Sequence, residues 1–152
     1  RKNKVLIYWV RRKTMLNLKE EGKEVSIELL EYEYPPGWGA GMPYNTDYII
    51  CKIKGRDGDE DFELEDSFLR FSEIESIYKN CMEVLDGESY GFESVIENPA
   101  LGFYVEIEDD HLAVHFQLAG DDLFSVCDIM NPVEFREMVD SIDEDLRSIA
   151  RM

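Results

Sequence analysis

The chain has 152 residues, of which 44% are hydrophobic and 33% are charged, a composition that predicts a folded globular domain rather than a disordered chain. It carries 34 acidic and 16 basic residues, which gives a formal net charge of -18. This excess disfavours nucleic acid and anionic membrane as partners, because both are bound through clustered Lys and Arg. It favours a basic protein as the partner instead.

The first 14 residues differ from the rest, because they contain six basic residues and no acidic one. Their apolar run, Val5–Val10, is too short for a signal peptide or a membrane span. Two interpretations stay open. In one, Met15 is the natural start and residues 1–14 are a basic extension that is not native; in the other, they form a basic strand or tail that folds back on the acidic body. We expect residues 15–152 to form a single α+β domain.

Alternation of apolar and polar residues predicts strands over residues 25–34, 48–54 and about 61–65. The segment Gly55-Arg56-Asp57-Gly58 is predicted to be the turn of a hairpin between the last two strands, because Asp-Gly favours the positive φ that such a turn needs. In the strand over 61–65, Phe62 and Leu64 are expected to face inward and the acidic residues outward. The hairpin is therefore predicted to have a strongly negative solvent face.

Helical spacing of apolar residues predicts a helix over 72–86, with Ser72 and Glu75 in the pattern of a capping box. Strands are expected over 90–96, 101–108, 111–119 and 123–129. A second helix follows, with Asn131 as its N-cap and Pro132 in its first position. The predicted fold class is α+β: one antiparallel, curved sheet of about six to seven strands, with two amphipathic helices packed on one side of it.

Cys51, Cys81 and Cys127 lie far apart within apolar patterns, which predicts small buried side chains in a reducing compartment. His111 and His115 lie four residues apart on a predicted strand, so about 13 Å separates them, too far for one metal ion.

The acidic run at 57–61 begins like a calcium loop, but Phe62 stands where such a loop needs Gly. No GxSxG motif and no phosphate-binding glycine loop is present in the sequence. We therefore expect no catalytic residues, no cofactor and no metal.

The segment 35–45 is a Pro- and Gly-rich loop that carries two large aromatic residues, Trp38 and Tyr44. Two interpretations stay open: these rings anchor an interface, or they fold down on the end of the sheet. Together with the acidic hairpin, the loop supplies the predicted partner-binding residues. They are Trp38, Tyr44, Asp57, Asp59, Glu60, Asp61, Glu63 and Glu65.

Four parts of the sequence resemble the WapI-type immunity proteins of bacterial polymorphic-toxin systems. They are the strand-like run VSIELLEYEYP at 25–35, the run DYIICKI at 47–53, the segment FLRFSEI at 68–74, and the turn IENPALGF at 96–103. The C-terminal strand pair and helix fit as well, so the resemblance covers roughly residues 23–152.

The resemblance implies a small cytoplasmic protein that binds the C-terminal domain of a toxin encoded beside it and blocks that domain. Toxins of this kind are often nucleases, whose basic clefts attract an acidic protein. The family offers no fixed binding residues to carry over. Two other functions remain as alternatives: an acidic adaptor or regulatory module for another basic protein, and an enzyme.

Overall fold

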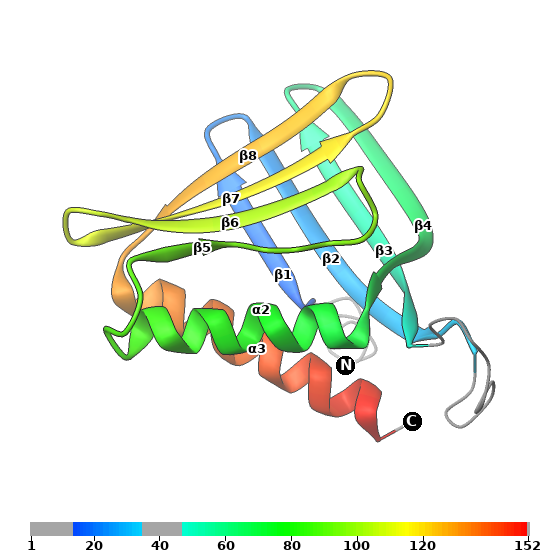
Figure 1. Cartoon of the computed structure of the whole chain (residues 1–152). Helices are drawn as coiled ribbons and strands as arrows, with labels where there is room; N and C mark the ends of the chain where they lie inside the picture. Colours follow the sequence, from blue (N-terminus) through cyan, green and yellow to red (C-terminus); the bar gives the residue numbers. More distant parts are fainter. Residues whose placement is uncertain (1–13, 35–46, 152) are drawn as a thin grey trace, which may run out of the picture.

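The computed structural model describes residues 14–34 and 47–151. In these residues the chain forms eight strands and two helices (Figure 1). In chain order they are β1 (Leu16–Glu20), β2 (Lys23–Tyr32), β3 (Tyr48–Asp57), β4 (Glu60–Arg70), α2 (Phe71–Leu85), β5 (Gly91–Glu93), β6 (Leu101–Glu108), β7 (His111–Ala119), β8 (Leu123–Met130) and α3 (Pro132–Ala150).

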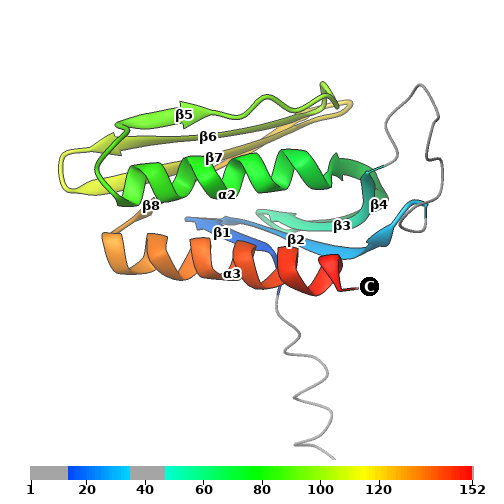
Figure 2. The same ribbon diagram turned by 60° about the horizontal axis from the view of Figure 1, so that its bottom comes forward.

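The strands divide into two antiparallel sheets, which have the orders β1-β2-β3-β4 and β5-β6-β7-β8. We call them sheet A and sheet B. The predicted α+β class and the antiparallel pairing are confirmed, but the strands form two four-stranded sheets rather than one. The division falls at α2, because this helix separates β4 from β5 and prevents a hairpin between them. The helices α2 and α3 lie side by side (Figures 1 and 2).

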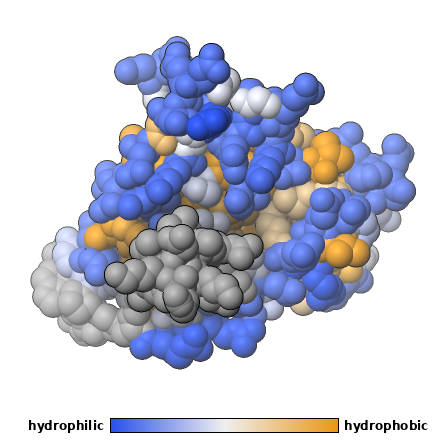
Figure 3. All heavy atoms as spheres, turned by 180° about the vertical axis from the view of Figure 1, so that it is seen from behind, coloured by the Kyte–Doolittle hydropathy of each residue, from blue (hydrophilic) through white to orange (hydrophobic). Residues whose placement is uncertain are grey.

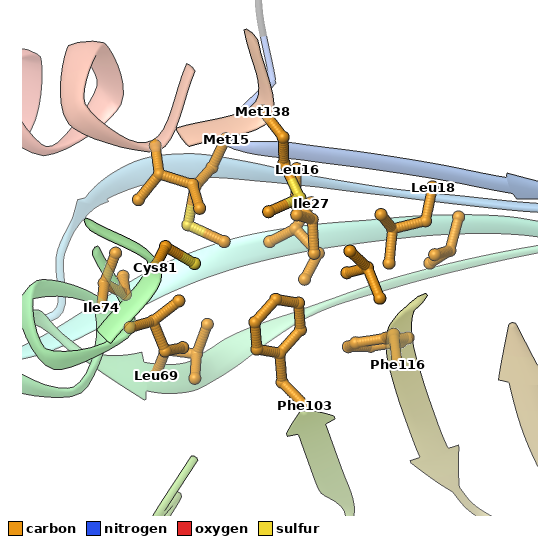
Figure 4. Close-up of a cluster of buried hydrophobic side chains, with 14 of the residues drawn as sticks. Met15, Leu16, Leu18, Ile27, Leu69, Ile74, Cys81, Phe103, Phe116 and Met138 are labelled. Atoms are coloured by element: carbon orange, nitrogen blue, oxygen red, sulfur yellow. The ribbon is translucent and has the colours of Figure 1, made fainter. Parts of the chain in front are cut away.

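The inner faces of both sheets and one face of each helix share a single hydrophobic core. Figure 4 shows Phe103 and Phe116 of sheet B beside Leu16 and Ile27 of sheet A. Ile74 and Cys81 approach from α2 and Met138 from α3, and all seven side chains are buried. Since this core joins both sheets, the two sheets depend on each other for stability.

Strand β1 was not predicted, because its alternation is only five residues long. Leu16 and Leu18 are buried, Asn17 and Lys19 are exposed, and a turn at Glu21-Gly22 leads into β2. Strand β4 is longer than predicted and continues to Arg70. A register shift opposite Ile49–Cys51 interrupts the alternation of apolar and polar residues in β4. The second half of the strand therefore could not be recognised from that alternation.

The predictions for the N-termini of the two helices have opposite outcomes. The predicted Ser72–Glu75 capping box is wrong: the N–H of Arg70 donates to Glu73 Oε1 at 2.9 Å, and the N–H of Ser72 donates to Asp47 Oδ2 at 3.1 Å. The predicted cap of α3 is confirmed. There the N–H of Glu134 donates to Asn131 Oδ1 at 2.8 Å, and the N–H of Asn131 donates to Glu134 Oε1 at 3.0 Å. Across residues 14–34 and 47–151, neither helix combines the length and apolarity needed to span a membrane.

Candidate functional site

Two predicted binding residues, Trp38 and Tyr44, lie outside the described residues, as does nearly all of the basic segment 1–14. Tyr32, which precedes the loop, packs against the core and stacks on Phe71 with ring centroids 6.2 Å apart.

The six predicted acidic residues lie on one hairpin. Asp57 is paired with Glu60, and Gly58 and Asp59 form a two-residue turn between them. Asp61 forms a two-point ion pair with Arg56, in which Arg56 Nε donates to Oδ1 at 2.7 Å and Nη2 to Oδ2 at 3.2 Å. The structure therefore brings these acids together, but it also places a cation beside them.

The outer face of this hairpin is balanced in charge, so the prediction of a strongly negative face is wrong. The register pairs each outward acid of β4 with an outward cation of β3. The pairs are Arg56 with Asp61, Lys54 with Glu63, and Lys52 with Glu65. Lys54 Nζ lies 3.9 Å from Glu63 Oε1. Of the six predicted acids, Asp59 and Glu60 at the turn have no cation opposite them, and Asp57 has Lys23 of β2 opposite it.

The outer face of sheet A is hollowed into an open depression of about 520 Å³. Its lining includes Glu24 and Ser26 from β2, Lys54 and Arg56 from β3, and Glu63 from β4. Both signs of charge line the depression, which suits a protein surface of mixed charge better than a simple anion or cation.

A second open hollow of about 420 Å³ lies where β2, β3 and β4 approach the connection between β5 and β6. Its acidic lining comes from Glu33, Asp66 and Glu97. Arg70 stands beside it, but Arg70 Nε donates to Asp47 Oδ1 at 2.8 Å and its Nη1 lies 3.6 Å from Glu97 Oε2. One guanidinium thus serves two carboxylates, and the hollow keeps an acidic character.

Sequence reasoning missed a cluster on the outer face of sheet B. His115 stacks on Tyr104, with ring centroids 4.1 Å apart and an interplanar angle of 8°. Its Nε2 lies 3.7 Å from Cys127 Sγ and 3.2 Å from Glu106 Oε1. The register of three neighbouring strands brings these residues together, which the strand pattern alone does not specify.

This cluster does not activate the thiol. Both Cys127 and Glu106 approach the same nitrogen of His115, whereas in a catalytic triad the acid orients the base through its other nitrogen. Burial, together with Glu20 and other nearby acids, raises the pKa of Cys127, the opposite of what a nucleophile needs. Burial also raises the pKa of both Cys51 and Cys81 to about 12. These two thiols are buried as predicted, while Cys127 is half-buried.

Charge is distributed differently over the two halves of the molecule. Residues 80–135, which include all of sheet B, contain 13 acidic residues and no Lys or Arg. Seen from behind, hydrophilic residues cover most of the described surface, and hydrophobic ones form separate spots (Figure 3). Within the described ranges no group of three or more His, Cys, Asp or Glu side chains is arranged to hold a metal ion.

These features describe an acidic α+β protein whose functional groups lie on open sheet faces and shallow hollows. A family model described as "Immunity protein WapI-like family" matches residues 15–150. The chain therefore belongs to the WapI-like immunity protein family, and membership implies a toxin as its binding partner. No curated protein and no solved structure matched the chain.

Proposed function

We propose that this chain neutralises a toxin domain that acts as a nuclease, in the cytoplasm of the cell that makes both proteins. Membership of the immunity family supports a toxin partner. The observation that supports a nuclease as the toxin is the excess of acidic residues in this chain. A nuclease must present a basic surface to the phosphates of its substrate, and an acidic protein is complementary to such a surface. A protein of net charge -18 is attracted to such a surface over several ångströms.

The acidic turn of the β3–β4 hairpin is the part of the predicted binding surface that we propose contacts the toxin. Asp57, Asp59 and Glu60 are exposed there. No cation stands opposite Asp59 or Glu60 in the register, whereas Lys23 of β2 stands opposite Asp57. Trp38 and Tyr44 remain proposed contacts from the loop that follows β2. Neither proposal requires a bond to be made or broken, and no catalytic residue is proposed.

The direct test uses the toxin domain encoded beside this chain's gene. Its cleavage of plasmid DNA and of total RNA is measured with and without an equimolar amount of this protein. We expect one of the two substrates to be cut and the cut to be suppressed. If the domain is bound and inhibited but cuts neither nucleic acid, the proposal that the toxin is a nuclease is wrong. If the domain is not bound at all, the immunity role itself is wrong.

A charge-reversal variant tests the binding surface. Changing Asp59, Glu60 and Asp61 to Lys together should lower the association rate at least tenfold at low salt, because electrostatic steering accounts for factors of about 10 to 1,000. The matched control reverses three exposed acids elsewhere, Glu83, Asp86 and Glu88. It alters net charge equally, so equal rates for both variants would show that the hairpin is not the contact surface.

A further inference from the structure

The two sheets have four edge strands, and only some of these edges are closed. Strands β1 and β8 run beside each other and are joined by side chains. Lys19 N–H donates to Asp128 Oδ2 at 2.8 Å, Cys127 N–H donates to Glu20 Oε1 at 3.0 Å, and Lys23 Nζ donates to the carbonyl of Ser125 at 3.1 Å. Strand β5 is three residues long. Strand β4, with eleven residues, is the long edge that no described strand pairs on its second side (Figure 1).

The backbone direction along β4 follows from the turn before it. Asp57 and Glu60 close a two-residue hairpin loop, and the residues that close such a loop form a hydrogen-bonded pair. Hydrogen-bonded and non-hydrogen-bonded pairs then alternate along an antiparallel ladder. The backbone groups of Asp61, Glu63 and Glu65 therefore point away from β3. These three residues offer donors and acceptors to a further strand.

The side chains on the outer face of sheet A alternate in sign from strand to strand. In one row the register joins Lys19 of β1, Glu24 of β2, Arg56 of β3 and Asp61 of β4. In another row it joins Glu28, Lys52 and Glu65. Opposite charges on neighbouring strands stabilise a sheet and like charges destabilise it. The alternation ends on an acidic strand, so the next strand in the series is expected to be basic.

The inner side of β4 is partly apolar. Leu64 points to the same side as the buried Ile53, its partner in the register, yet 42% of its surface is exposed. A strand beside β4 would cover Leu64 with one set of side chains and meet Asp61, Glu63 and Glu65 with the other. A segment that fits the edge of β4 is therefore expected to alternate cationic and apolar residues.

We propose that β4 receives an extended segment of the toxin as a fifth strand of sheet A, and that this segment carries Lys or Arg at alternate positions. The inference rests on the proposed function and specifies how the partner is held. In strand addition, backbone hydrogen bonds supply affinity and alternate side chains supply specificity. A second copy of this chain does not fit the same edge, because its acidic β4 would meet an identical acidic strand.

The first test compares Glu63→Pro with Glu63→Gln. Both variants remove the charge, but proline also removes the outward N–H and leaves the bonds to β3 in place, since that N–H is not part of the ladder. We expect Glu63→Pro to bind the toxin domain at least tenfold more weakly than Glu63→Gln, with equal circular dichroism spectra and similar thermal midpoints. Equal affinity of the two variants for a toxin domain that the wild type binds would overturn strand addition while leaving the immunity role intact.

The second test needs no toxin. A synthetic ten-residue peptide that alternates valine and lysine is added to the isotope-labelled protein, and amide exchange is followed by NMR. We expect slower exchange at Asp61, Glu63 and Glu65, and no such protection from a peptide that alternates valine and glutamate. Protection centred on sheet B, protection by both peptides, or no protection from the lysine peptide would each overturn the assignment of β4.

Discussion

Sheet A and sheet B have the same number of strands and the same meander order, but their outer faces differ. Sheet A presents rows of alternating charge, whereas sheet B presents Tyr104, His115 and Cys127 in a row and has no Lys or Arg in its strands. The cations of sheet A neutralise acids that the sequence pattern marks as exposed. A count of acids along one strand therefore does not give the electrostatic potential of a sheet face, because the charges on the neighbouring strand contribute equally to it.

The inner faces of the two sheets are alike, because both are apolar and belong to the same core. This shared core contributes most to the free energy of unfolding. Phe62 of sheet A lies over Gly55, where an added Cβ would meet its ring at 2.2 Å, and it packs edge-on against Phe124 of sheet B at 5.1 Å between centroids. Contacts of this kind hold the sheets together from within. The outer faces can therefore differ without loss of the fold.

Removing a large side chain from the shared core should give the largest effect. Phe116 of sheet B is 2% exposed and lies beside sheet A residues in the core (Figure 4). Phe116→Ala should lower the free energy of unfolding by about 3–5 kcal/mol, from lost transfer energy and the cavity left behind. Urea unfolding followed by circular dichroism measures the loss. Phe116→Leu, as the control, should lose much less, and two separate unfolding transitions would show that the sheets do not share one core.

Asp47, which directly precedes β3 of sheet A, is hydrogen-bonded to the start of α2, the helix that leads into sheet B. Burial opposes its ionisation, but the hydrogen bonds from Arg70 and Ser72 outweigh this and lower its pKa. A lowered pKa means that the ionised carboxylate contributes stability above the ordinary carboxyl pKa and that this contribution is lost as pH falls. Asp47→Asn should therefore cost about 1–2 kcal/mol at pH 7.

The pH dependence separates this role from simple packing. The stability gap between Asp47→Asn and the wild type should narrow as the pH is lowered from 7 to 3, because the wild-type carboxyl becomes neutral as well. Urea midpoints across this range measure the gap. Asp59→Asn, in the exposed turn, serves as the control and should leave the midpoint unchanged. A gap that is constant with pH would contradict the charge-based cap.

Local signals account for what the sequence predicted correctly, and long-range pairing accounts for what it did not. The cap of α3 needs only Asn131, Pro132 and Glu134, which are neighbours in the chain, so its prediction was confirmed. The cap of α2 depends on Asp47, 25 residues before Ser72, and no local pattern reveals that contact. Period-two alternation likewise marks strands without stating which of them pair, so the division into two sheets could not be foreseen.

The charge rows of sheet A were only partly within reach of the sequence. Inward Ile53 implies outward Lys52 and Lys54, but the turn predicted at 55–58 lies at Gly58-Asp59 in the structure, and β3 continues to Asp57. The register of β3 and β4, and with it the ion pairs, therefore differs from the one that the predicted turn implies. The His115–Cys127 approach needs the register of β7 and β8 in addition, and the turn at Gly120-Asp121-Asp122 does not fix it from sequence alone.

Replacing one cation on the outer face of sheet A by an acid should destabilise the fold, because neighbouring strands would then place like charges beside each other. Lys52 is half-buried between Glu28 and Glu65 in the register. Lys52→Glu replaces two opposite-charge neighbours by two like-charge neighbours, so it should cost about 1 kcal/mol. Thermal midpoints measured at 20 mM and at 1 M NaCl should show a loss that shrinks with salt. Lys52→Gln should lose less, and a salt-independent loss would assign the effect to packing of the lysine stem.

The seam between the two sheets should give the smallest effect, and its sign is opposite to that of Asp47. Burial raises the pKa of Asp128, although the N–H of Lys19 donates to it and acts in the other direction. A raised pKa means that ionisation in the folded state is unfavourable, so stability contributed by this group increases as pH falls. Asp128→Asn keeps an oxygen that can accept the same hydrogen bond and removes the charge. It should therefore be equal to the wild type, or more stable by a few tenths of a kcal/mol, at pH 7, with the difference vanishing at acid pH. A variant that is clearly less stable at pH 7 would show that the ionised carboxylate holds the seam together, and the two edges would then be closed by charge rather than by hydrogen bonding.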